Sequence, residues 1–427
     1  MTNIKKIMGL AILTSLASKA SGFIYQVLSI PLIAKALGPE DFGLFLVYSG
    51  FSTWLSLLAL GIAPTVTSLA ADKSRENELP TAFVSSTGLL LCVFAFMAMI
   101  LLIIIPHISS YSILFSPKNT SVFWCAYITF SLNIILSIAD AVNQGQQRQH
   151  INNINFAIAN TLNIVLIYIS VFYLPEESLV LLFVISQIGF ILTRLGNSVW
   201  LGSRLMLSSG RFSIRFVREF LKNSGAFIFV QLSVLISQQA IVVLCLEKVG
   251  TNLSGEVGLV FRAYALLGSV IAMINQPLWP LINTAISENR VSWVKQLFKK
   301  LLASYLTYGM LVIGLLAILG KPIFDLWTAH VYPLNRTEHI LIGVHFLLIS
   351  LSQGCVVMLM GMGLFHQLAK LLMIEAVLGY CAIYLAIELD VLVDLETVLT
   401  LFIFINCLTS FWLLPTKVFA FLRKTSA

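Results

Sequence analysis

The second half of this chain repeats the positions of several proline, glycine and histidine residues of the first half. Four pairs of these residues share one offset of 216 positions. The pairs are Pro64 and Pro280, Pro106 and Pro322, Gly145 and Gly361, and His150 and His366. Most of them stand at or near the ends of apolar segments. Two similar halves within a membrane are the usual architecture of a transporter. The repeat therefore restricts the fold and the class of function together.

Apolar segments of about 20 residues recur from one end of the chain to the other, and each is long enough to cross a bilayer as a helix. The chain is 58% hydrophobic and only 11% charged, which is exceptional for a soluble protein. The twelve segments are roughly 9–36, 43–70, 82–105, 121–143, 153–173, 179–202, 224–247, 258–285, 298–319, 339–362, 369–389 and 397–420. The sequence predicts an all-α polytopic membrane protein with twelve transmembrane helices and no soluble catalytic module.

Six helices in each half is an even number, so both halves enter the membrane from the same side and form parallel repeats. We expect an N-terminal six-helix bundle over residues 1–206, a basic cytoplasmic linker over 207–222 and a C-terminal six-helix bundle over 223–427. Within the linker, residues 212–222 are predicted to form a short amphipathic helix.

Basic residues are distributed unequally between the two sides of the predicted membrane. If the N-terminus is inside, cytoplasmic segments carry 18 Lys and Arg residues and the opposite side carries 5. Because basic loops remain in the cytoplasm, this bias predicts cytoplasmic N- and C-termini. The six cysteines stand singly within apolar segments and form no metal-binding spacing, so we expect no metal site.

Five of the charged residues that fall within the predicted helices are candidates for function. Three are cations, Lys19, Arg194 and Arg262, and two are acids, Asp140 and Glu375. A charge in this position costs about 2.5–3.5 kcal/mol on insertion scales, so it faces a partner or a watery cavity. None of the five is repeated in the other half, as expected of groups that serve one asymmetric ligand. The alternative for each is an internal salt bridge or a side chain that reaches the membrane surface.

An excess of buried cations suggests an anionic cargo, and phosphate is the natural candidate. Amides on helical faces, including Asn153, Asn160, Gln231 and Gln238, would suit sugars, although they also serve as contacts between helices. The sequence has no Walker A loop, HExxH or GxSxG motif, which disfavours the enzyme classes that use them.

The segment Leu37-Gly38-Pro39-Glu40-Asp41-Phe42-Gly43-Leu44 resembles an element of bacterial polysaccharide flippases. Leu60 to Pro64 and Ser254 to Leu259 are similar to the helix that follows it and to its counterpart in the second half. The family is the Wzx-type O-antigen flippases of the multidrug/oligosaccharidyl-lipid/polysaccharide (MOP) exporter superfamily. The resemblance implies a V-shaped, MATE-like pair of six-helix bundles in the bacterial inner membrane.

The resemblance also implies a function in lipopolysaccharide biosynthesis: transfer of an undecaprenyl-diphosphate-linked oligosaccharide to the periplasmic leaflet by alternating access. Lys19, Arg262 and Arg194 are the candidate diphosphate-binding residues, and Glu375 and Asp140 the candidates for ion coupling or gating. The resemblance implies no cofactor beyond coupling to a proton or sodium gradient. Partners would be membrane lipid, a polysaccharide polymerase and a chain-length regulator, with no nucleic acid. A drug/cation antiporter of the same superfamily and a membrane-embedded polysaccharide polymerase are the alternatives.

Overall fold

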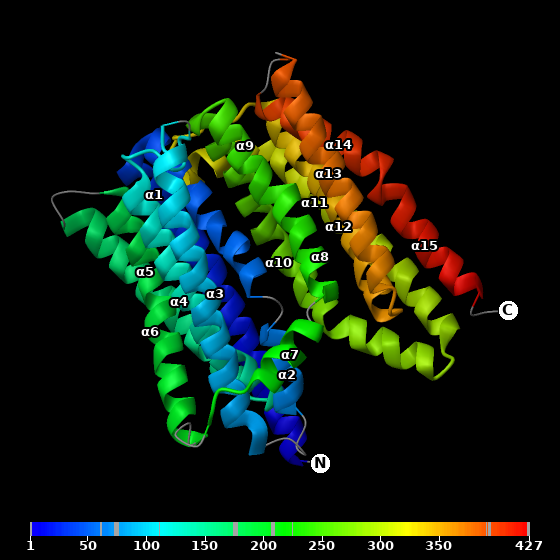
Figure 1. The fold of residues 1–427 in the computed structure, drawn as a ribbon. Helices are drawn as coiled ribbons and strands as arrows, with labels where there is room; N and C mark the ends of the chain where they lie inside the picture. Colours follow the sequence, from blue (N-terminus) through cyan, green and yellow to red (C-terminus); the bar gives the residue numbers. More distant parts are fainter. Residues whose placement is uncertain are drawn as a thin grey trace. The chain divides into compact units, whose positions relative to one another are not determined.

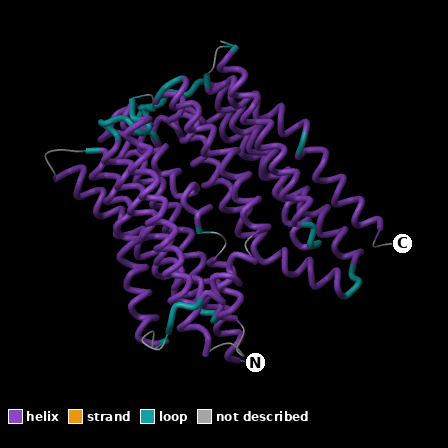
Figure 2. The backbone as a smooth tube through the Cα atoms, viewed as in Figure 1, coloured by secondary structure: helices purple, strands orange, loops and turns teal. Residues whose placement is uncertain are grey.

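The apolar segments form long helices joined by short loops in a computed structural model of the chain (Figures 1 and 2). The structure describes residues 2–59, 62–71, 77–110, 112–173, 178–205, 210–223, 225–389, 391 and 394–424. The helices group into two compact units, Met1–Ile228 and Phe229–Ala427, and each unit is described separately. Residues 207–209 of the predicted linker lie outside the described residues.

Unit 1 is an all-helical bundle. Its helices are α1 (Thr2–Leu58), α2 (Ile62–Ala71), α3 (Leu79–Ile108), α4 (Thr120–Gly145), α5 (Gln149–Tyr173), α6 (Leu179–Arg204) and α7 (Ile214–Asn223). Helix α1 contains two of the predicted membrane segments. They are separated at Gly38, where the backbone leaves the helical region with a φ of 70°. A positive φ at this point suits glycine, which has no Cβ to clash.

The chain reverses direction at Gly38. Before the turn, Asn153 at the start of α5 donates a hydrogen bond to Thr14 at 3.3 Å. After the turn, the Tyr48 hydroxyl donates to the carbonyl oxygen of Leu114 at 2.6 Å, in the loop between α3 and α4. The chain then returns to the first side, where the Thr67 hydroxyl lies 3.2 Å from the carbonyl oxygen of Ala141 near the end of α4. The two arms of α1 are therefore antiparallel, and the motif around Gly38 forms the first hairpin of the bundle.

Helix α6 packs closely on α5 because it carries glycine at the contact. A Cβ added at Gly189 would lie 2.5 Å from the carbonyl oxygen of Ala159 and 2.5 Å from Oδ1 of Asn163. The same Asn163 Oδ1 accepts the backbone N–H of Gly189 at 2.7 Å, and its Nδ2 donates to the Ser186 carbonyl at 2.9 Å. Close approach and hydrogen bonding therefore join these two helices at one point, as is common between membrane helices.

The predicted amphipathic helix is present as α7. Phe216 and Phe220 are buried and lie 6.1 Å apart between ring centroids, and α7 packs on α2 and α3. On its exposed side, Arg215 forms an ion pair with Glu78 at 3.7 Å. The alternation of phenylalanine and arginine thus gives α7 an apolar face that packs on the rest of unit 1 and an exposed polar face.

Unit 2 repeats this plan. Its helices are α8 (Gly225–Val234), the π-helix η3 (Leu235–Ala240), α9 (Ile241–Lys248), α10 (Thr251–Ser287), α11 (Val291–Trp327), α12 (Arg336–Gly361), α13 (Phe365–Glu388), α14 (Leu395–Leu408) and α15 (Ser410–Lys424). The division between the units falls within α8. Helix α12 packs most extensively on α11 and also contacts α10 and α14.

The repeat is visible in the helix boundaries. Helix α4 begins at Thr120 and ends at Gly145, and α12 begins and ends 216 residues later, at Arg336 and Gly361. Helices α13 and α14 begin at the same offset from α5 and α6. The turn after each of α4 and α12 has a residue of positive φ at the same offset, Gln147 at 60° and Gly363 at 73°.

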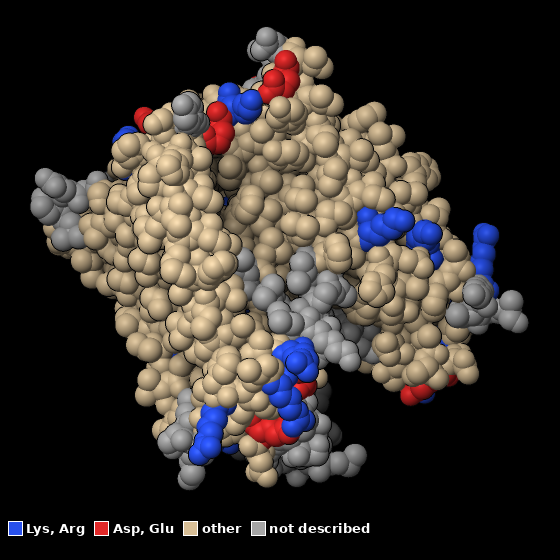
Figure 3. Space-filling model, viewed as in Figure 1, with Lys and Arg blue, Asp and Glu red and all other residues tan. Residues whose placement is uncertain are grey.

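Eleven helices in the described chain are long and apolar enough to cross a membrane. The first, Leu13–Leu57, is 45 residues long and contains both arms of α1, so it accounts for two of the twelve predicted segments. Large apolar side chains such as Ile103 and Ile318 are exposed on the outside of the helices, as expected for surfaces in contact with lipid. In Figure 3, charged side chains gather toward the helix ends. The all-α, polytopic fold predicted from the sequence is confirmed.

Candidate functional site

Two of the predicted site residues, Arg194 and Asp140, pair with each other inside unit 1. Arg194 Nε donates to Asp140 Oδ2 at 3.1 Å, and the two side chains are 29% and 24% exposed. The Arg194 Nη1 also donates to the backbone carbonyl and the side-chain Oδ1 of Asn133, both at 3.2 Å. The guanidinium of α6 therefore neutralises the carboxylate of α4.

A network of asparagines surrounds this ion pair. Asn197 donates to Asp140 Oδ1 at 2.8 Å, and Asn143 donates to Asn197 at 2.9 Å and to Asn152 at 3.2 Å. Asn152 in turn donates to the backbone carbonyl of Asp140 at 2.8 Å. The network ties α4, α5 and α6 together and gives hydrogen-bond partners to most of its polar groups, with Oδ1 of Asn143 the exception.

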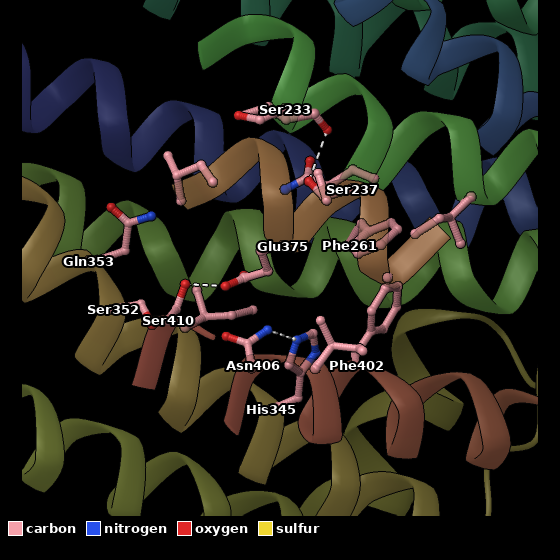
Figure 4. Close-up of a pocket in the computed structure, with 18 of the residues that line it drawn as sticks. Ser233, Ser237, Phe261, His345, Ser352, Gln353, Glu375, Phe402, Asn406 and Ser410 are labelled. Atoms are coloured by element: carbon pink, nitrogen blue, oxygen red, sulfur yellow. Dashed lines mark hydrogen bonds between the residues drawn. The ribbon is translucent and has the colours of Figure 1, made fainter. Parts of the chain in front are cut away.

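Unit 2 contains a cavity of about 270 Å³ inside its helix bundle (Figure 4). Helices α8, η3, α9, α10, α12, α13, α14 and α15 contribute lining residues. Gln238 of η3 and Gln353 of α12 are exposed, whereas Phe402 and Asn406 of α14 are buried. The exposed amides of Gln238 and Gln353 therefore lie at the entrance of the cavity, and the buried face of α14 forms its closed end.

Glu375 is the acid of this cavity. The Thr409 hydroxyl lies 2.7 Å from Glu375 Oε2, and the Ser410 hydroxyl donates to the same oxygen. These two hydroxyls come from the break between α14 and α15, where Thr409 leaves the helical region with ψ of −89°. In the described part of the chain, the contacts of Glu375 are thus hydroxyl groups rather than a cation.

His345 lies at the closed end of the cavity and is 4% exposed. Its ring stacks on Phe402 with centroids 5.2 Å apart and an interplanar angle of 8°. The Asn406 amide reaches Nε2 at 3.5 Å, and Nδ1 lies 3.0 Å from the hydroxyl of Tyr264. Sequence reasoning missed this histidine, because a single polar residue in an apolar segment carries little signal.

Comparison with known proteins identifies the family. A family profile described as "Polysaccharide biosynthesis protein" matches residues 11–286. The chain belongs to this family. A search of curated proteins by sequence finds no match.

Solved structures with the same fold are transporters of the MOP superfamily. An inward-facing MATE-family multidrug resistance transporter is 16% identical, with a TM-score of 0.81, 95% of this chain covered and 96% of that chain. A MOP superfamily transporter from Pyrococcus furiosus, described as having a binding pocket of reverse polarity, is 15% identical with a TM-score of 0.69; the coverage is 98% and 96%. The member of the polysaccharide biosynthesis family described here therefore has a MATE-like fold.

The two repeats of this family member differ where the buried charges lie. Ser410 stands 216 positions after Arg194, and Val356 stands 216 positions after Asp140. At the places where unit 1 has an ion pair, unit 2 therefore has a serine and a valine. Unit 2 adds Glu375, whose counterpart in unit 1 is Ala159.

Lys19 and Arg262 belong to different units, Lys19 to α1 in unit 1 and Arg262 to α10 in unit 2. Both are half-buried. Lys19 has neither an ion pair nor a hydrogen bond among the described residues. Arg262 follows Phe261, which lines the cavity, but is not itself one of the lining residues.

The amides predicted to face sugars divide into two groups. In unit 1, Asn153 and Asn160 join α5 to α1 through Thr14 and Ser21, at 3.3 and 3.1 Å, and so act as contacts between helices. In unit 2, Gln238 lines the cavity. The amides of unit 1 are thus contacts between helices, whereas Gln238 borders a cavity and Gln231 does not.

Proposed function

We propose that this protein moves an undecaprenyl-diphosphate-linked oligosaccharide from the cytoplasmic to the periplasmic leaflet of a bacterial inner membrane. The observation that carries the proposal is a polysaccharide biosynthesis family match over residues 11–286 on the fold of a MOP-superfamily transporter. A transporter in such a biosynthetic family needs a cargo that is made on one side of the membrane and used on the other. An O-antigen repeat unit carried on a lipid has this property.

Lys19 is the cation that best fits a diphosphate ligand. It is half-buried in a membrane helix, where a lone ammonium is costly, and no carboxylate among the described residues neutralises it. Arg262, half-buried in α10, is the second proposed ligand. Arg194 is a weaker one, because its guanidinium is occupied by Asp140 and Asn133.

Glu375 is the proposed coupling group. Asp140 is neutralised by Arg194, so its charge is already compensated inside unit 1. Glu375 faces a cavity and is held by hydroxyls, so a proton or a sodium ion could bind and leave without breaking an ion pair. The excess of basic residues on one side places both termini of the chain in the cytoplasm under this proposal. A polysaccharide polymerase and a chain-length regulator would act on the cargo after transfer.

A drug/cation antiporter is the second candidate function, and one observation favours it. The cavity combines the Glu375 carboxylate with the aromatic rings of Phe261 and Phe402, which together could hold an organic cation. The structural relatives include multidrug resistance transporters. The two functions differ in the charge of the cargo.

Reconstitution distinguishes them. The full chain in liposomes would be given a polyprenyl diphosphate bearing one fluorescent N-acetylglucosamine, and, separately, ethidium. A flippase exposes the lipid-linked sugar to a membrane-impermeant quencher on the opposite side and does not transport ethidium. Transport of ethidium without movement of the lipid would replace the proposal by the antiporter. In the organism that carries the gene, its deletion should remove surface polysaccharide.

A further inference from the structure

The cavity of unit 2 has features that the transport of a diphosphate does not need. We propose that it is a subsite for one sugar ring of the cargo, and this inference rests on the proposed function. Four features of the cavity support this: its hydrogen-bonding groups, its aromatic side, its size and the differences between its lining and the corresponding residues of unit 1.

The polar groups of the cavity match a neutral polyol. Gln238, Gln353 and Asn406 present amides, each of which can both donate and accept hydrogen bonds. A sugar hydroxyl also donates and accepts, so neighbouring hydroxyls can pair with a single amide. The Glu375 carboxylate and the Ser352 hydroxyl add an acceptor and a further adaptable group. A phosphate would need donors only, and a simple cation would need acceptors only.

An aromatic side faces these polar groups. In Figure 4, Phe261 and Phe402 lie together on one side of the cavity, and Ser352 and Gln353 lie on the opposite side, with Glu375 between them. A pyranose ring has an apolar C–H face and a rim of hydroxyls. Packing its C–H face on the phenylalanines would turn its hydroxyls toward the amides, and aromatic surface supplies much of the binding energy in such sites.

The size of the cavity fits a single sugar. At about 30 Å³ per water molecule, a volume of about 270 Å³ corresponds to roughly nine waters, which is on the order of the space that one sugar ring occupies and is too small for an oligosaccharide. Pockets for drug-sized ligands are larger, about 300–1,000 Å³. The described residues include no group of three His, Cys, Asp or Glu side chains that could hold a metal ion, so a metal centre does not account for the space.

The repeat shows that the residues lining this cavity differ from their counterparts in unit 1. Arg194 and Asp140 of unit 1 are replaced by Ser410 and Val356 in unit 2, which removes an ion pair from the interior. Gln353 replaces Ser137, and Gln238 replaces Gly22, at the same offset of 216. The substitutions thus remove a buried ion pair and add amides at the entrance of the cavity. This combination is expected for a binding site and not for packing alone.

The test is binding of sugars by the full-length chain in lipid nanodiscs. Saturation-transfer NMR would measure a panel of methyl glycosides of glucose, galactose, rhamnose, N-acetylglucosamine and N-acetylgalactosamine. We expect at least one to bind, and Gln353→Leu and Gln238→Leu each to weaken it about three- to tenfold, as for a lost polar contact. Phe402→Leu should weaken it too. Gln367→Leu is the matched control, because Gln367 is exposed on α13 outside the cavity.

Failure of the subsite is distinguishable from failure of the proposed function. If no glycoside binds, or if binding survives the two glutamine variants, the subsite is wrong. The lipid-linked sugar assay is run on the same preparations. Movement of the lipid-linked sugar without glycoside binding removes the subsite and keeps the flippase. Binding that depends on the cavity, with no movement of the lipid, keeps a sugar site and removes the flippase. Melting temperatures of each variant show whether the fold is intact.

Discussion

Arg194 and Asp140, 54 residues apart in the chain, form an ion pair of 3.1 Å that joins α6 to α4 inside unit 1. At the repeat-equivalent positions, unit 2 has Ser410 and Val356. The same scaffold thus contains a neutralised charge pair in one half and, in the other, a cavity with a carboxylate held by hydroxyls.

Replacing Arg194 by leucine should destabilise unit 1, because Asp140 would keep only neutral partners. Each side chain is about a quarter exposed, so we expect a loss of about 1–3 kcal/mol, below the 3–5 kcal/mol of a fully buried pair. The melting temperature of the purified chain should fall by roughly 3–10 °C. The double variant Arg194→Leu with Asp140→Leu should recover most of the loss.

The same double variant tests the role of Arg194 in transport. If the pair serves only packing, the double variant should move the lipid-linked sugar at close to the wild-type rate. A double variant that folds well but no longer transports would return Arg194 to the set of diphosphate ligands.

Lys19→Ala should abolish or strongly reduce transport, by tenfold or more, without lowering protein levels. The reason is that a half-buried ammonium with no partner among the described residues is available to a diphosphate. Export of surface polysaccharide and movement of the lipid-linked sugar would both be measured. Lys35→Ala is the control, since Lys35 lies in the same helix but is exposed. Near-normal export by the Lys19 variant would remove this residue from the cargo site.

Gly189→Ala should destabilise the contact between α5 and α6. The added methyl group would lie 2.5 Å from the carbonyl oxygen of Ala159, which is backbone and cannot move aside easily. We expect a cost of about 1–3 kcal/mol, as for overpacking elsewhere. Gly196→Ala in the same helix has no heavy atom within 4 Å of the new Cβ and should be neutral or slightly stabilising. Equal melting temperatures for the two variants would contradict this account of the contact.

The helices could be predicted because their signals are local. Whether a run of apolar residues is long enough to cross a membrane can be read directly from the sequence. Gly145 and Gly361 mark helix ends in the sequence as they do in the structure. The turn at Gly38 was similarly visible in its glycine and proline. These features depend on residues near one another in the chain, so periodicity and composition are sufficient to find them.

The candidate site could be predicted only in part. Glu375 and Asp140 stood out as charges within apolar segments, but nothing in the pattern indicated that Asp140 would meet Arg194. The cavity was not visible at all, because its lining comes from side chains of helices that are far apart in the chain. Contacts between distant segments and empty space both depend on tertiary packing.

Glu375→Gln should uncouple transport from the ion gradient. Glutamine keeps a side-chain oxygen that can accept from Thr409 and Ser410, so the fold should be retained, but it cannot gain or lose a charge. Proteoliposomes would be compared under an imposed pH gradient, an imposed sodium gradient and no gradient. We expect the wild-type chain to respond to one gradient and the glutamine variant to transport at the rate seen without a gradient. Glu375→Asp retains the charge and should keep part of the response, and Glu396→Gln, outside the cavity at the start of α14, should keep all of it. A glutamine variant that is still driven by the gradient would place coupling on another group.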